Sequence, residues 1–184
     1  MDLKQFNQAG AAGDHFSQLG IPHQFDVDPD LLKRNYLALA RQTHPDFFAG
    51  SPDQLPDALT AAAAIHGAYR TLSDPVARAE YLLLRHGGKD SAADKRVPPE
   101  MLTDVLEIRE DMLDATAAGD QARLAAIRQR MLQQEAHILE TISGLARRLT
   151  ATREPAATGD PATLDALRVQ LNAMKYVKNI LEQL

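Results

Sequence analysis

The sequence contains no cysteine and no tryptophan. Without cysteine the chain can form no disulfide, no thiolate metal site and no cysteine nucleophile. Iron or zinc chemistry would therefore have to use histidine and carboxylate ligands, or it would belong to a partner. With 45% hydrophobic and 24% charged residues the composition is otherwise that of an ordinary globular protein, so we expect the chain to fold.

The sequence also lacks an excess of positive charge and long apolar segments. Its formal net charge of −5 disfavours binding to duplex nucleic acid, which depends on clustered Lys and Arg. No apolar run approaches the roughly 20 residues of a membrane-spanning helix, and residues 1–16 lack the basic and apolar regions of a signal peptide. We therefore expect a soluble cytoplasmic protein with no nucleic-acid or membrane partner, or an organelle protein whose targeting segment is absent. Residues 1–13 are expected to fray.

Strand patterns are scarce, whereas apolar residues recur at spacings of three and four along most of the chain. The sequence therefore predicts an all-α protein. In the N-terminal half, the Asp-Pro pairs at 28–29 and 74–75 are typical helix starts. The four helices expected there cover approximately residues 14–19, 28–43, 56–72 and 75–87.

A polar stretch rich in Gly and Pro, GGKDSAADKRVPP, has the composition of a connector between domains. We predict a first domain over residues 14–88, a linker over 89–98 and a second domain over 99–184. Three amphipathic helices joined by short turns are expected in the second domain, which predicts an antiparallel three-helix bundle. These helices cover approximately residues 101–118, 120–149 and 160–184.

The second predicted helix ends in the tripeptide His44-Pro45-Asp46. At 100° per residue, one side of this helix is apolar and is expected to be buried, and the other side carries cations. The apolar side comprises Leu32, Tyr36, Leu39 and Thr43, and the basic side comprises Lys33, Arg34 and Arg41. By itself, a basic helix face is most simply a solvated surface.

Catalysis by the tripeptide is one alternative. A histidine oriented by a carboxylate can act as a base, but it also needs a nucleophile or a metal, and the sequence indicates no third member. The other histidines show no close ligand pairing such as His-x-x-x-His. A purely structural role is another alternative, because Pro45 forces the preceding residue out of helical geometry and Asp46 can cap the loop. A metal-dependent hydrolase using His44 and Asp46 remains an alternative function.

A basic helix that ends in His-Pro-Asp, with a short helix before it and an apolar helix after a loop, resembles the J domain. In J domains this tripeptide stimulates ATP hydrolysis by DnaK-class chaperones. The resemblance implies a chaperone-ATPase-binding surface made of Lys33, Arg34, Arg41, His44, Pro45 and Asp46. Two positions depart from the family pattern. Phe47 stands where Lys is common after the tripeptide, and Thr43 stands where an aromatic residue is common before it.

Three further stretches resemble the HscB type of J-domain co-chaperone over residues 14–184. They are YRTLSDPVARAEYLLLRHG at 69–87, MLTDVLEIREDM at 101–112 and LNAMKYVKNILEQL at 171–184. The resemblance implies an L-shaped protein whose first domain is the J domain, with no active site and no cofactor of its own. It implies that the protein brings an IscU-type iron–sulfur cluster scaffold to an HscA-type chaperone ATPase, aiding cluster assembly and transfer. The absence of a cysteine-bearing N-terminal extension points to the bacterial form.

The resemblance also implies a scaffold-binding surface on the helix over 101–118 and on the last helix. The matching residues are Leu102, Thr103, Leu106, Glu107, Glu110, Asp114 and Tyr176. The first six lie at the border between an apolar arc and an acidic face, which suits a small hydrophobic centre with a charged rim. The alternatives are an amphipathic helix with a solvated acidic face, a Tyr176 that only packs at the edge of the bundle, and a J-domain adaptor for a different client.

Overall fold

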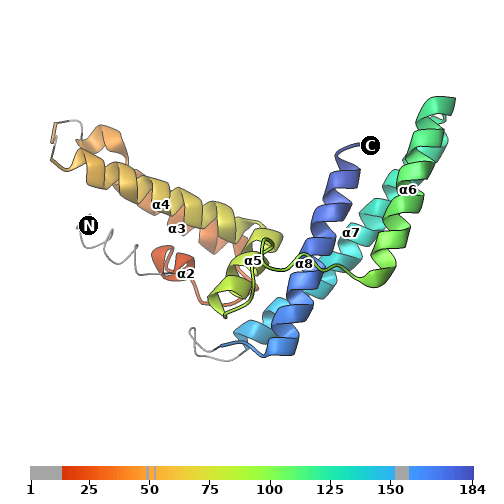
Figure 1. Cartoon of the computed structure of the whole chain (residues 1–184). Helices are drawn as coiled ribbons and strands as arrows, with labels where there is room; N and C mark the ends of the chain where they lie inside the picture. Colours follow the sequence, from red (N-terminus) through yellow and green to blue (C-terminus); the bar gives the residue numbers. More distant parts are fainter. Residues whose placement is uncertain (1–13, 49, 52, 152–157) are drawn as a thin grey trace. The chain divides into compact units, whose positions relative to one another are not determined.

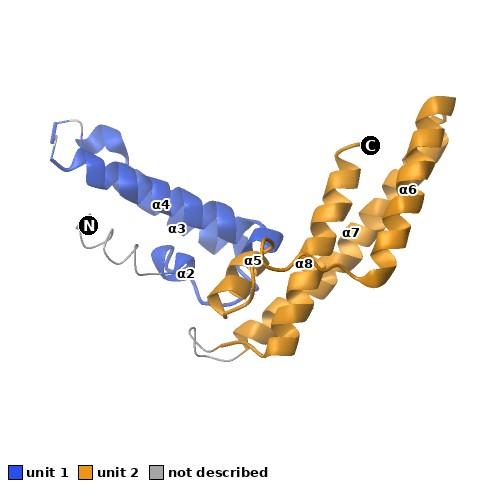
Figure 2. Ribbon diagram, viewed as in Figure 1, with its two compact units in different colours: residues 1–78 blue, residues 79–184 orange. Residues whose placement is uncertain are grey.

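The computed structural model describes residues 14–48, 50–51, 53–151 and 158–184, and these residues form helices and loops without any β-strand (Figure 1). The prediction of an all-α protein is confirmed. The fraying expected of residues 1–13 concerns a stretch outside the described residues. The chain divides into two compact units, residues 1–78 and residues 79–184 (Figure 2).

The first unit is built around two helices, α3 and α4, that lie side by side (Figure 1). Its elements are α2 (His15–Gln18), α3 (Pro29–Gln42), the 3-10 turn η1 (Pro45–Phe48), α4 (Leu55–Ser73) and the beginning of α5 (Pro75–Arg85). Helix α3 starts at the predicted cap, where the Asp28 carboxylate accepts hydrogen bonds from the backbone N–H groups of Asp30 and Leu31. Such local caps explain why the helix starts were predictable.

The core of the first unit lies where α2 and α3 pack against α4. Its fully buried side chains include Phe16, Leu19, Leu32, Ile65 and Leu72. Arg78 closes this unit by donating through Nε to the Leu72 carbonyl (2.8 Å) and through Nη1 to the Phe25 carbonyl (2.6 Å). Its guanidinium also lies 5.4 Å from the centroid of the Phe25 ring.

The second unit contains the predicted three-helix bundle, made of α6 (Pro99–Ala118), α7 (Gln121–Thr150) and α8 (Pro161–Leu181). Gly119 adopts a left-handed conformation (φ 67°) at the end of α6, and Asp120 caps the start of α7 one residue later. This two-residue turn makes α6 and α7 antiparallel. The bundle core includes Ile108, Ile127, Met131, Ile142, Leu171, Met174 and Ile180.

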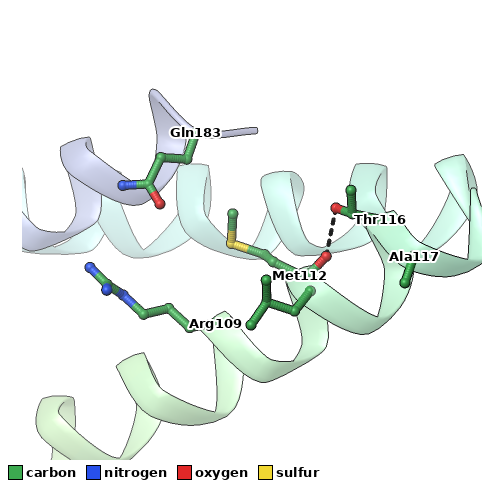
Figure 3. Close-up of a pocket in the computed structure, with 6 residues that line it drawn as sticks. Arg109, Met112, Thr116, Ala117 and Gln183 are labelled. Atoms are coloured by element: carbon green, nitrogen blue, oxygen red, sulfur yellow. Dashed lines mark hydrogen bonds between the residues drawn. The ribbon is translucent and has the colours of Figure 1, made fainter.

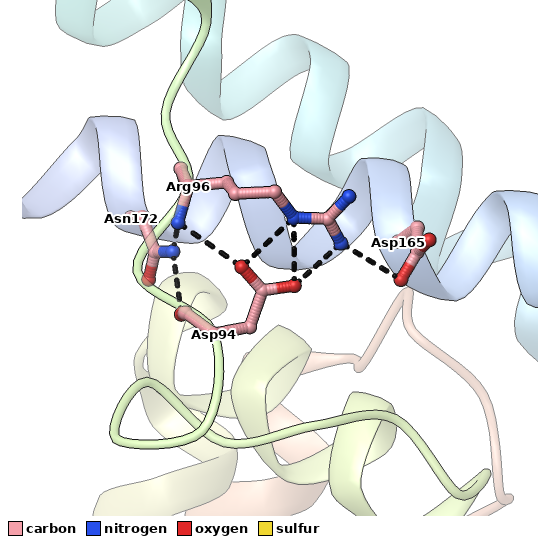
Figure 4. A network of polar contacts seen from close by, with 4 residues as sticks. All are labelled: Asp94, Arg96, Asp165 and Asn172. Carbon is pink, nitrogen blue, oxygen red and sulfur yellow. Dashed lines mark hydrogen bonds and ion pairs between the residues drawn. The ribbon is translucent and has the colours of Figure 1, made fainter.

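The stretch predicted as a linker, residues 89–98, lies inside the second unit and is held on α8 by a polar network (Figure 4). Asn172 on α8 donates from Nδ2 to the backbone carbonyls of Asp94 (2.9 Å) and Arg96 (2.8 Å). The buried Asp94 carboxylate accepts from Arg96 Nε at 3.0 Å, and Arg96 also pairs with Asp165 at 3.1 Å. The Arg96 guanidinium holds the pKa of the Asp94 carboxyl well below its usual range.

The division between the two compact units falls inside α5, after Arg78. The reason is that the end of α5 belongs with α8. Arg168 of α8 is buried and donates to the Glu80 carboxylate, and the Gly159 N–H donates to the His86 carbonyl at 3.0 Å. None of the helices in the described ranges is long and apolar enough to span a bilayer.

Candidate functional site

The His-Pro-Asp tripeptide follows directly on the end of α3. Thr43 caps this helix and is fully buried, and both its N–H and its hydroxyl donate to the Leu39 carbonyl at 3.0 Å. Pro45 then begins η1. Proline has no backbone N–H, and the first position of a helical turn does not need one. The tripeptide therefore lies in a loop whose start is fixed by a buried cap.

His44 and Asp46 point to one another but remain largely exposed. The Asp46 backbone N–H donates to His44 Nδ1 at 3.3 Å, and the Asp46 carboxylate lies 3.5 Å from the same nitrogen. One nitrogen cannot accept the first contact and donate to the second at the same time, so the ring makes only one of these two hydrogen bonds at a time. At this exposure the pair contributes little to stability.

Among the described residues, the fold places no group of metal ligands at the His44 and Asp46 pair. In the part of the chain that the structure describes, no group of three or more His, Asp or Glu side chains could hold a metal ion. When His44 accepts at Nδ1, its ring proton lies on Nε2 and is available to a partner.

The predicted basic face of α3 is exposed as expected. Leu32 and Thr43 are buried on the opposite side, whereas Lys33, Arg34 and Arg41 face solvent. None of these three cations pairs with a carboxylate of another described residue. They are therefore free to meet acidic groups of another protein.

Phe47 is an unusual neighbour for such a surface. Its side chain is 75% exposed, and its ring meets the His44 ring edge-on with 6.2 Å between the centroids. The position that commonly carries a cation in J domains thus presents an apolar ring here. Thr43, the other departure from the family pattern, is accounted for by its cap.

Helix α6 separates its apolar residues into two rows. Met101, Ile108 and Ala115 repeat every seven residues and are buried in the bundle. The neighbouring leucines at 102, 106 and 113 are 56%, 65% and 71% exposed. The apolar arc expected from the sequence is therefore only half buried, and its other half is an exposed row that we call the leucine row, made of Leu102, Leu106 and Leu113.

The predicted scaffold-binding residues on α6 all lie at this exposed surface. Thr103, Glu107, Glu110 and Asp114 face solvent beside the leucine row. Asp111, which was not among the predicted residues, is engaged by Arg123 of α7 at 2.6 Å. The helix therefore presents exposed leucines with carboxylates beside them.

Tyr176 lies on α8 and is also exposed. It lines a shallow hollow of about 190 Å³ with Ser91, Lys95, Asn172 and Lys175. None of the residues that line this hollow belongs to α6. The six predicted residues of α6 thus lie together on one helix, and Tyr176 lies on α8 beside Lys95 and Lys175.

Leu113 is the residue that the sequence-based selection left out. Among the leucines of α6, Leu113 is the most exposed. It follows Leu106 by seven residues, which is two helical turns. The spacing of Leu113 from Leu106 could have indicated that both lie on the same exposed side of the helix. A leucine in an amphipathic helix is, however, normally expected in the core.

Two family models match this sequence. Residues 14–81 match the DnaJ domain, and residues 97–184 match the HSCB C-terminal oligomerisation domain. A curated co-chaperone protein HscB homologue of Vibrio cholerae serotype O1 is 36% identical over 136 residues, which covers 71% of this chain and 78% of that protein. The HscB homologue of Bordetella pertussis is 37% identical over 137 residues, covering 73% of this chain and 79% of that protein.

Solved structures show the same architecture. The chaperone HscB from Vibrio cholerae matches with a TM-score of 0.65 at 30% sequence identity, covering 93% of this chain and 99% of that chain. The crystal structure of human co-chaperone protein HscB matches with a TM-score of 0.76, covering 93% of this chain and 80% of that chain. At 23% identity, the human protein supports the fold alone.

Proposed function

Because this chain belongs to the HscB family of co-chaperones, we propose that it stimulates the ATPase of an HscA/DnaK-class chaperone and delivers an IscU-type iron–sulfur scaffold protein to it. The delivery aids iron–sulfur cluster assembly and transfer in the cytoplasm. The observation that carries the proposal is the pair of exposed surfaces. One is basic and surrounds His-Pro-Asp in the first unit, and the other is apolar with an acidic rim on α6 in the second unit.

The basic surface acts on the chaperone. Lys33, Arg34 and Arg41 have no carboxylate partner within the described chain, so they are available to steer toward an acidic surface of the ATPase. His44, Pro45 and Asp46 then contact the part of the ATPase that controls hydrolysis. The effect is allosteric, because the tripeptide favours one of two states of its partner through contacts that differ between them.

The acidic and apolar surface holds the scaffold. Leu102 and Leu106 supply a hydrophobic centre, and Glu107, Glu110 and Asp114 supply a charged rim around it. Thr103 and Tyr176 add contacts at the border. Carrying the scaffold on the same chain as the J domain raises the scaffold's effective concentration at the chaperone without any new contact. The protein works without an active site or a cofactor of its own.

Steady-state ATP turnover by an HscA-type chaperone tests this proposal. The turnover is measured for the chaperone alone, with this protein, with an IscU-type scaffold, and with both. We expect stimulation by this protein and a larger stimulation when the scaffold is also present. If this protein stimulates the chaperone, but the scaffold neither binds to it nor changes the stimulation, the protein is instead a J-domain adaptor for a different client. No stimulation under any condition would refute the proposed function.

A further inference from the structure

The C-terminal end of α6 carries an open apolar groove next to the leucine row (Figure 3). The groove has a volume of about 550 Å³, whereas one water molecule occupies about 30 Å³ of liquid. It is therefore large enough for a bulky side chain. Its lining residues are Arg109, Met112, Leu113, Thr116, Ala117 and Gln183.

The floor of the groove is fixed by the bundle core. Met112 is partly buried and packs against the buried cluster that includes Ile108, Met131 and Ile180. The Thr116 hydroxyl donates to the Met112 carbonyl at 2.7 Å, so its proton is already used within α6 (Figure 3). Met112 thus anchors the apolar floor of the groove to the bundle core.

The groove continues the surface proposed to hold the scaffold. Leu113 lies seven residues beyond Leu106 on the same side of α6, about 10 Å along the helix axis. Burying an exposed leucine against a partner lowers the free energy, and all three leucines of the row lie on one side of this helix. A partner that covers Leu102 and Leu106 therefore reaches Leu113 with two further helical turns of contact.

The charges around the groove indicate the kind of partner. The lining of the groove carries one charged residue, Arg109, which is the single cation of α6, and the carboxylates of Glu107, Glu110 and Asp114 are exposed elsewhere on the same helix. A second copy of this chain placed against α6 would bring these carboxylates against their own copies, which is unfavourable. A segment that carries an apolar side chain with Lys or Arg residues nearby complements the apolar groove and the exposed carboxylates of α6.

We propose that this groove binds an apolar side chain on a basic segment of the IscU-type scaffold, with Leu113 as a second anchor of the docking surface. The inference rests on the proposed function and deepens it. Arg109 and Gln183, which face one another across the groove in Figure 3, supply N–H donors for the backbone carbonyls of the same segment. Leu113 then contributes to specificity, since it selects scaffolds with an apolar residue at the matching place.

Titration calorimetry of the full-length protein with the scaffold tests the inference, using Leu113→Asp. We expect the affinity to fall about tenfold or more. The new carboxylate would by itself favour a basic partner, so a loss of affinity reports the lost apolar contact. Leu113→Met should bind as the unchanged protein does. Leu59→Asp is the matched control, because Leu59 is 52% exposed on α4, outside the proposed surface, and its change should leave the affinity unaltered.

The outcomes separate this inference from the function on which it rests. If the unchanged protein does not bind the scaffold, both are wrong. If it binds and Leu113→Asp binds equally well, only the groove's role is refuted. Analytical ultracentrifugation tests whether a second copy of this chain occupies the groove instead. If the unchanged protein is a dimer, and Leu113→Asp dissociates this dimer without changing the affinity for the scaffold, a second copy covers the groove and the inference is overturned. Circular dichroism verifies that each variant keeps its helical content.

Discussion

Thr43 shows how a single residue can place a signature tripeptide. Its N–H and its hydroxyl both donate to the Leu39 carbonyl, and its side chain is fully buried, so α3 ends at Gln42 with Thr43 as its cap, directly before His44. Pro45 prevents the helix from continuing, because it disfavours helical geometry in the preceding residue. The chemistry of the tripeptide therefore depends on a residue that does not itself face solvent.

His44 provides the sharpest test at this scale. We expect His44→Gln to abolish stimulation of the chaperone ATPase, because glutamine cannot reproduce the ring that Asp46 orients through its backbone N–H and carboxylate. Scaffold binding should be unchanged, since His44 lies in the first unit and the docking residues lie in the second. The measurements are steady-state ATP turnover and calorimetry with the scaffold. Full stimulation by the variant would show that the tripeptide is not the activating element.

Among the elements, α6 carries the most information about function. Its buried row repeats every seven residues, and its leucine row lies beside it on the exposed side. One helix thus contributes both to the bundle core and to the surface that we propose binds the scaffold. The separation matters because substitutions in the leucine row leave the bundle core intact.

Replacing Leu102, Leu106 and Tyr176 together by Ala should therefore weaken scaffold binding without unfolding the protein. Removing two exposed leucine contacts and one aromatic contact should lower the affinity by about a hundredfold or more. Stimulation of the ATPase by the protein alone should survive. Calorimetry with the scaffold measures the first effect and ATP turnover the second. An unchanged affinity would mean that this docking surface is wrongly assigned.

The segment that crosses α8 at residues 94–96 is a second informative element. The pKa of Asp94 is lowered chiefly by its side-chain hydrogen bonds with Arg96, so the ionised carboxylate stabilises the folded state. That stabilisation is present above the ordinary aspartate pKa of about 3.9 and is lost as the pH falls toward the lower folded value. The contribution should therefore be complete at neutral pH.

We expect Asp94→Asn to lower the urea midpoint of unfolding at pH 7, and the difference from the unchanged protein to shrink as the pH falls below about 4. Asp165→Asn is the control, because Asp165 also contacts Arg96, at 3.1 Å, but its side chain is largely exposed. Its effect should be smaller. Equal midpoints for Asp94→Asn and the unchanged protein at pH 7 would show that the network adds no stability.

The helix limits could be predicted because they depend on neighbouring residues. The Asp28 cap, the αL glycine at Gly119 and the Asp160 cap act within one turn of the chain, and each was visible in the sequence. Which α6 leucines stay exposed was harder to predict, because Met101 and Leu102 differ by only 100° around the helix. The decision rests with α7 and α8, which cover the first and not the second.

The role of residues 89–98 could not be predicted for a similar reason. Their polar composition, directly after Gly87 and Gly88, is typical of a free connector. The residue that holds them, Asn172, lies 76 to 78 positions later in the chain. Composition reports local preference and does not report such distant partners.

At the scale of the whole molecule, the two units carry surfaces of opposite character. The first presents cations around His-Pro-Asp, and the second presents leucines edged with acids. Two partners can therefore be recognised by different physical means on one chain. The L-shaped arrangement inferred from the resemblance stays a prediction, as does the assignment of the J domain to residues 14–88.

This difference predicts unequal responses to salt. Raising the ionic strength from 0.1 M to 1 M shortens the screening length from about 10 Å to about 3 Å. We expect the affinity for the chaperone ATPase to fall about tenfold, because its first contact is mainly electrostatic. The affinity for the scaffold should fall less, since apolar burial contributes more of it. Parallel calorimetric titrations measure both, and equal losses would contradict the division of roles.

The clamp from Asn172 also has a consequence for how the protein is made. Asp94 and Arg96 leave the ribosome 78 and 76 residues before the amide that will hold their carbonyls. At roughly 5–20 residues per second, the interval is about 4 to 15 seconds. During synthesis the first unit can thus complete its own core while the segment after it still waits for its last helix.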